Sequence, residues 1–126
     1  MTPQQTLTRW RVASAILAVA IGTSTLVPLP PSPAGIPPWT DKLVHVAMYA
    51  SLMFALQNAF ARRYLARLAF AALCYGAAIE CLQHFSGYRS GSAADGIANG
   101  IGIALVIIVT RYRRAFRQQE SIHTSE

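Results

Sequence analysis

Four stretches of this chain carry almost no charge, and each has the length of a helix that crosses a lipid bilayer. Each contains about 18 residues, or about 27 Å of α-helix, which nearly matches a hydrocarbon core of roughly 30 Å. Hydrophobic residues make up 53% of the 126-residue chain and charged residues only 13%. Four soluble helices this apolar would leave almost no polar surface. The sequence therefore predicts an all-α, four-transmembrane-helix bundle over residues 12–29, 43–61, 68–85 and 93–110.

Most basic residues flank these predicted helices on one side. They lie before the first helix, between the second and third, and after the fourth, whereas the other two connections hold Lys42 and Arg89. The positive-inside rule therefore places both termini of this multi-pass protein in the cytoplasm. Trp10 and Trp39 lie at opposite ends of the first hairpin, as an aromatic belt would place them. The flanking residues are Arg9, Arg11, Arg62, Arg63, Arg67, Arg111, Arg113, Arg114 and Arg117.

Several other classes of protein are excluded. Disorder requires low hydrophobicity and high charge, the opposite of this composition. The net charge of +6 would suit a nucleic-acid partner only if it gathered on one folded face, but here it marks helix ends. Cys74 and Cys81 are about 10 Å apart along one predicted helix, too far for a disulfide. A cleavable signal peptide remains an alternative for the first stretch, although its length exceeds the usual apolar region of about 7–15 residues.

The chain divides into a cytoplasmic N-terminal segment (1–11), the membrane domain (12–110) and a basic, then polar cytoplasmic tail (111–126), which we expect to fray from Gln118. Residues 30–40 contain five prolines and predict a stiff strap over the outer ends of the helices. The Gly- and Ser-rich residues 86–92 predict a second outer turn.

Polar side chains occur within three of the predicted helices, always near the outer end. Ionisable groups are costly in hydrocarbon, so each is a functional-site hypothesis. We estimate the height of each residue above the cytoplasmic end of its helix from a rise of about 1.5 Å per residue. Two layers result, one at about 18–20 Å (Tyr49, Glu80 and Asn99) and one at about 24 Å (His45, Gln83 and Asp95). A spacing of four residues puts those of each helix on one face. The sequence thus predicts an outward-opening polar cluster of Asp41, Lys42, His45, Tyr49, Glu80, Gln83, Arg89, Asp95 and Asn99.

Purely structural interpretations exist for several of these residues. Asp41 suits the N-cap of the second helix, and Lys42 suits a side chain that snorkels outward. Gln83 and Asn99 suit hydrogen bonds between helices, and the glycines of the fourth helix suit close packing.

Glu80 is harder to explain by packing. A carboxylate about 7 Å below the outer edge must be protonated or have a partner such as Arg89 or His45. His45, His84, Glu80 and Asp95 are residue types that hold metals, but a close-spaced ligand pair such as HxxxH is absent from the sequence. We therefore expect no metal and no other cofactor.

The order and spacing of the polar residues resemble the VanZ-like family of small bacterial membrane proteins. The resemblance covers about residues 38–110. It implies a four-helix inner-membrane protein and a family link to teicoplanin (glycopeptide) resistance, although many members have no known resistance role. The motif is Asp41-Lys42-x-x-His45-x-x-x-Tyr49, then Glu80-x-x-Gln83, then Arg89, Ser92, Asp95, Asn99 and Gly102.

Three functions are compatible with these features. The first is a cell-envelope factor that binds a lipid-linked or anionic headgroup through Arg89 and Lys42. His45, Glu80 or Asp95 would be the catalytic acid or base, and whether any reaction occurs is left open. The second is a small proton-coupled transporter that relays protons through the same three residues. The third is a non-enzymatic subunit that assembles with itself or with a partner in the lipid bilayer.

Overall fold

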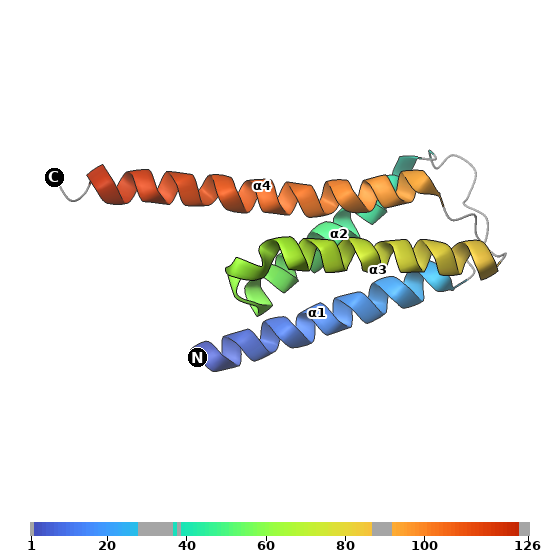
Figure 1. Cartoon of the computed structure of the whole chain (residues 1–126). Coiled ribbons are helices and arrows are strands. Elements are labelled where there is room, and N and C mark those ends of the chain that lie inside the picture. The colour runs from blue at the N-terminus through green and yellow to red at the C-terminus, as the bar shows by residue number, and fades with distance from the viewer. Residues whose placement is uncertain (1, 28–36, 38, 87–91, 124–126) are drawn as a thin grey trace.

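The chain folds into four α-helices that run alternately up and down (Figure 1). The computed structural model describes residues 2–27, 37, 39–86 and 92–123. Both termini lie at one end of the bundle, and we call the opposite end the distal end. The prediction of an all-α protein with four helices is therefore confirmed. The helices are α1 (Pro3–Leu26), α2 (Trp39–Ala59), α3 (Leu65–Ser86) and α4 (Ala93–His123), with a 3-10 turn, η1 (Arg62–Tyr64), before α3.

All four helices extend beyond the predicted stretches at one end at least, α1 and α4 by the most residues. The helix α1 starts at Pro3, because Thr2 and Gln5 form a capping box and proline suits the first helical position. The helix α4 continues to His123, so the expectation that the tail frays from Gln118 is wrong. Arg, Gln and Glu favour helix, and elongation needs no new nucleus. The predicted strap (30–40) and outer turn (86–92) lie mostly outside the described residues.

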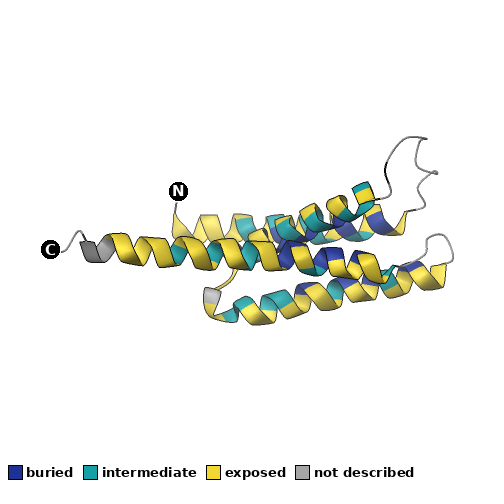
Figure 2. Ribbon diagram, turned by 90° about the horizontal axis from the view of Figure 1, so that it is seen from above, coloured by how far each residue is buried: buried dark blue, intermediate teal, exposed yellow. Residues whose placement is uncertain are grey.

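The core lies along α2, which contacts each of the other three helices and has its largest interface with α4. Tyr49, Leu52 and Met53 on α2 are almost fully buried, together with Ile21 of α1 and Ile103 of α4. Figure 2 shows that buried residues face the interior of the bundle and that the outward faces are exposed. The central position of α2 means that residues on it can meet partners from several helices.

The helices α2 and α4 run parallel and in register. Near the distal end, His45 of α2 pairs with Asn99 of α4, 54 positions later. Near the other end, the Thr110 hydroxyl donates to Gln57 Oε1 at 2.9 Å, an offset of 53 positions. An almost constant offset along the interface fixes which side chains of the two helices can meet.

Gly102 allows this close contact. A Cβ atom on Gly102 would run into the backbone of α2 at Val46 and would lie 3.0 Å from the backbone nitrogen of Ala50. At Gly96 a Cβ would meet nothing within 4 Å, and at Gly100 it would make only an ordinary contact. Close packing predicted for the glycines of the fourth helix is therefore confirmed at Gly102 and not at Gly96.

The outer surface is apolar enough for a membrane. In the part of the chain that the structure describes, α3 and α4 are long and apolar enough to cross one. Only 17% of the most apolar window of α3 and 28% of that of α4 is buried against protein. Core helices of a soluble protein would bury most of these windows, but Phe70 and Ile97 are 69% and 65% exposed. Two predicted spans are thus supported by length and composition.

Replacing Gly102 with alanine should destabilise the bundle by about 1–3 kcal/mol, because the added methyl group forces α4 away from α2. Gly96→Ala is the matched control on the same helix, where alanine meets open space and should stabilise the helix by up to about 1 kcal/mol. Thermal unfolding of the detergent-solubilised protein, followed by tryptophan fluorescence, would compare the two. Equal unfolding midpoint temperatures for Gly102→Ala and Gly96→Ala would contradict the close contact of α4 with α2 at Gly102.

Candidate functional site

Five of the predicted site residues meet at the distal end, between the first turns of α2 and of α4. Three of them, His45, Asp95 and Asn99, are only 2–4% exposed. The parallel register of the two helices brings them together. We call this group the distal cluster; it consists of Asp41, Lys42, His45, Asp95 and Asn99.

Lys42 forms an ion pair between helices. Its ammonium group donates to the Asp95 carboxylate of α4 and also lies 3.3 Å from Asp41 Oδ2. The Asp95 side chain is only 6% exposed, so a cation beside it offsets part of the cost of burying its charge. The interpretation that Lys42 snorkels outward is therefore wrong, because its charge is directed toward Asp95.

Asp41 is the third residue of α2, which begins at Trp39. It is therefore not the N-cap, and that structural interpretation is also wrong. A carboxylate in the first helical turn is still stabilised by the helix dipole. Asp41 Oδ1 lies 4.0 Å from Nε2 of His45, one turn further along the same face.

The imidazole of His45 is held by Asn99. Nδ1 of His45 lies 3.0 Å from Oδ1 of Asn99. An amide oxygen only accepts hydrogen bonds, so Nδ1–H is the donor and the neutral ring has its lone pair on Nε2. The hydrogen bond thus leaves a basic nitrogen directed toward Asp41.

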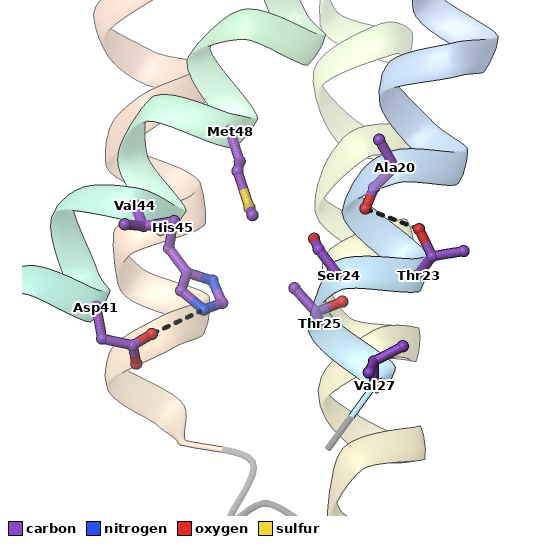
Figure 3. A pocket seen from close by; sticks show the side chains of 9 residues that line it. All are labelled: Ala20, Thr23, Ser24, Thr25, Val27, Asp41, Val44, His45 and Met48. Atoms are coloured by element: carbon purple, nitrogen blue, oxygen red, sulfur yellow. Dashed lines mark hydrogen bonds and ion pairs between the residues drawn. The ribbon is translucent and has the colours of Figure 1, made fainter. Parts of the chain in front are cut away.

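The distal cluster borders a pocket of about 520 Å³ between α1 and α2, a volume typical of small-molecule sites. Figure 3 shows the α2 side chains on one side of this space and the α1 side chains on the other. The wall from α1 includes three consecutive hydroxyl residues, which the sequence interpretation overlooked. The lining residues are Ala20, Thr23, Ser24, Thr25, Val27, Asp41, Val44, His45 and Met48.

Tyr49 lies one turn below His45 and is fully buried, with 1% exposure. A Cβ on Gly76 of α3 would lie 3.0 Å from both the Tyr49 hydroxyl and the Asn99 amide nitrogen. Gly76 therefore makes room for Tyr49 and for Asn99, the hydrogen-bond partner of His45. The sequence interpretation missed this glycine, whose only signal is its position among larger apolar residues.

The predicted residues of α3 make different contacts. Glu80 Oε2 accepts a hydrogen bond from the Ser92 backbone nitrogen at 3.0 Å, and Glu80 lines a groove of about 410 Å³ between α3 and α4 with His84. Gln83 donates to the Thr25 carbonyl at 2.6 Å, which confirms its predicted hydrogen bond between helices. Arg89, the predicted partner of Glu80, lies outside the described residues.

The structure brings together a different set of possible metal ligands from the set considered in the sequence. One ligand atom from each of Asp41, His45 and Asp95 lies within 4.8 Å of the others. His84 and Glu80, which were considered from the sequence, lie instead in the groove between α3 and α4. The signal that could have identified this set is the i,i+4 spacing of Asp41 and His45, which puts two ligand types on one helical face.

A comparison with protein families gives one match, to a model described as VanZ/LLP1, over residues 2–115. The chain belongs to the VanZ/LLP1 family. The match confirms the VanZ-like resemblance and extends it from about residues 38–110 to include α1. Together with the apolar α3 and α4, membership of VanZ/LLP1 identifies a membrane protein. No curated protein matches the chain. No solved structure matches it either.

The hydrogen bond from His45 to Asn99 predicts that the neutral ring of His45 is the Nδ1–H tautomer. Replacing Asn99 with leucine removes the acceptor, so the population of the Nε2–H tautomer should rise. Nitrogen-15 chemical shifts of labelled histidine in detergent micelles would report both forms. The exposed His84 serves as an internal control and should not change. An unchanged tautomer at His45 would contradict the assigned role of Asn99.

Proposed function

We propose that this VanZ/LLP1 protein crosses the bacterial inner membrane four times, with the distal end outside and both termini in the cytoplasm. The apolar exterior of the described helices supports four crossings: Ile16 and Val19 of α1 are 62% and 65% exposed, as the side chains of α3 and α4 are. The orientation is supported by the nine arginines that lie near the terminal end.

Accessibility of single cysteines tests this topology. In a chain with Cys74→Ser and Cys81→Ser, we expect a membrane-impermeant maleimide to label Ser32→Cys and Ser86→Cys in intact cells. The variants Ala61→Cys and Ser125→Cys should react only after the membrane is permeabilised. Labelling of either of these two in intact cells would contradict the four-crossing, termini-inside arrangement.

We also propose that the distal end binds the anionic headgroup of a lipid or of a lipid-linked envelope precursor. The observation that supports this is the pocket between α1 and α2, which combines an apolar wall with the edge of the distal cluster. Val44 and Met48 offer contacts for a hydrocarbon chain. The hydroxyls of Thr23 and Ser24 donate to carbonyl oxygens of α1 and would have to rotate to donate to a headgroup.

The roles within this site follow from the contacts. His45 Nε2 borders the pocket and is able to accept a proton from a bound headgroup. Lys42 is already paired with two carboxylates, so it is less available to phosphate than the sequence suggested. The proposal that Arg89 binds phosphate rests on the sequence alone.

The distribution of buried polar groups favours binding over proton transport. Toward the terminal end, the buried polar side chains of the described residues include Ser14 and Gln57. The Ser14 hydroxyl donates to the Trp10 carbonyl at 2.7 Å, and Gln57 accepts from Thr110. Neither side chain titrates, whereas the relays of pumps use chains of titratable groups.

Lipid binding tests the proposal directly. Native mass spectrometry of the detergent-solubilised protein should detect a polyprenyl phosphate bound more tightly than zwitterionic phosphatidylethanolamine. His45→Leu should weaken binding of the polyprenyl phosphate about tenfold or more, because a buried polar contact is lost. Gln57→Leu is the matched control, since it removes a polar contact between the same two helices at the other end.

The same variants provide a cellular readout of the family link to glycopeptide resistance, in which we propose that this protein takes part. In a teicoplanin-susceptible host, the wild type and Gln57→Leu should raise the inhibitory concentration of teicoplanin, and His45→Leu should not. Equal polyprenyl phosphate binding by His45→Leu and Gln57→Leu would contradict the proposed headgroup site.

A further inference from the structure

The described charged side chains of the distal cluster include more carboxylates than cations. They are the carboxylates of Asp41 and Asp95 and one ammonium group, that of Lys42. Glu80 on α3 adds another carboxylate at the same end of the bundle. Like charges repel strongly where water is scarce, so a cation bound among these carboxylates would favour the binding of an anionic headgroup.

The distal cluster also directs several electron-pair donors toward one point. Nε2 of His45 and Oδ1 of Asp41 are 4.0 Å apart, too far for a hydrogen bond, and neither atom carries a hydrogen in the neutral tautomer. His45 is only 2% exposed, and the printed neighbour of its Nε2 among the described residues is the Asp41 carboxylate. Lone pairs that converge in this way are stabilised by a cation between them.

We propose that Asp41, His45 and Asp95 form a divalent-cation site, and that Lys42 is an internal cation occupying part of it in the absence of metal. The Lys42 ammonium group already lies against both carboxylates. Its single positive charge offsets only one of the two carboxylates, and it makes no hydrogen bond to His45 among the described contacts. A metal ion would satisfy all three ligands at once.

The geometry is close to that of a small divalent-metal site. In a tetrahedral zinc site with bonds of about 2.0–2.2 Å, the ligand atoms lie about 3.3–3.6 Å apart, and the three ligand atoms here lie within 4.8 Å of one another. Binding would therefore require the Asp41 side chain, which is 40% exposed, to move about 1 Å toward the other two ligands. The hydrogen bond from His45 to Asn99 supplies the second contact that orients most metal-binding histidines.

The ligand set also indicates which metals are favoured. Imidazole suits zinc and other late transition metals, whereas carboxylates suit manganese, magnesium and calcium. Two carboxylates and one imidazole therefore suit Zn²⁺ best, Mn²⁺ less well, and Mg²⁺ least. The remaining coordination positions would face the pocket between α1 and α2, because Asp41 and His45 both line it.

A bound cation would supply positive charge that favours an anionic headgroup, with a phosphate oxygen completing its coordination. Displaced from the carboxylates, the Lys42 ammonium group would remain at the same end of the bundle, available to that phosphate. The binding of phosphate to the metal rests on the proposed headgroup function. The binding of the cation does not depend on that function and is measurable without lipid.

Zinc binding to the full-length, tag-free protein in detergent tests the site. After treatment with EDTA and its removal, Zn²⁺ would be titrated against a chromogenic chelator. We expect one Zn²⁺ per chain, bound at least tenfold more weakly by Asp95→Asn, which loses a ligand, and about 10–100-fold more weakly by Asn99→Leu, which loses the orienting contact. Glu120→Gln makes the same type of charge change near the terminal end and should bind Zn²⁺ as tightly as the wild type.

Lys42→Met distinguishes a metal site from a structural ion pair. Both Lys42→Met and Asp95→Asn break the pair between α2 and α4 and should lower thermal stability in the same direction. Zinc affinity should instead rise in Lys42→Met, which removes the competing cation, and fall in Asp95→Asn. Absence of stoichiometric Zn²⁺ binding by the wild type, or equal affinities in these two variants, would overturn the proposal. Polyprenyl phosphate binding without Zn²⁺ would leave the headgroup function intact.

Discussion

The close parallel contact of α2 with α4 is the constraint on which the distal end depends. Gly102 lets the two backbones approach, and the register that results is nearly the same at His45, with an offset of 54 positions, and at Gln57, with an offset of 53. With this register set, the Asp95 carboxylate accepts a hydrogen bond from Lys42. A shift of α4 by one residue would rotate its polar side chains by about 100° and separate each from its partner.

The helices α1 and α3 also run parallel to each other and are joined by polar contacts at a nearly constant offset. The Tyr75 hydroxyl donates to the Ala18 carbonyl with an offset of 57 positions, and Gln83 donates to the Thr25 carbonyl with an offset of 58. The bundle is therefore built from two parallel pairs of helices, each joined by its own polar contacts. The pocket at the distal end lies between α1 of one pair and α2 of the other.

The sequence was informative about everything that depends on local pattern. Charge-free length predicted four helices, and four-residue spacing put Asp41 and His45 on one face. The partners of these residues were less predictable, since they depend on how the helices rotate against one another. Lys42 was interpreted as snorkelling because its target, Asp95, lies 53 positions away. Hydroxyl residues 23–25 were overlooked because their importance comes from facing α2. The end of α4 was misplaced because its polar residues suggested solvent rather than helix.

The spacing of the partners along the chain has a consequence for biogenesis. Synthesis delivers the helices in order, so α2 emerges before Asp95 and Asn99 have been made. During this interval Lys42 can already pair with its neighbour Asp41, which lowers the cost of placing both charges near hydrocarbon. Arrival of α4 then converts this provisional pair into one that joins two helices. The distal cluster is therefore completed by the last helix to be translated, and a chain truncated before α4 lacks it.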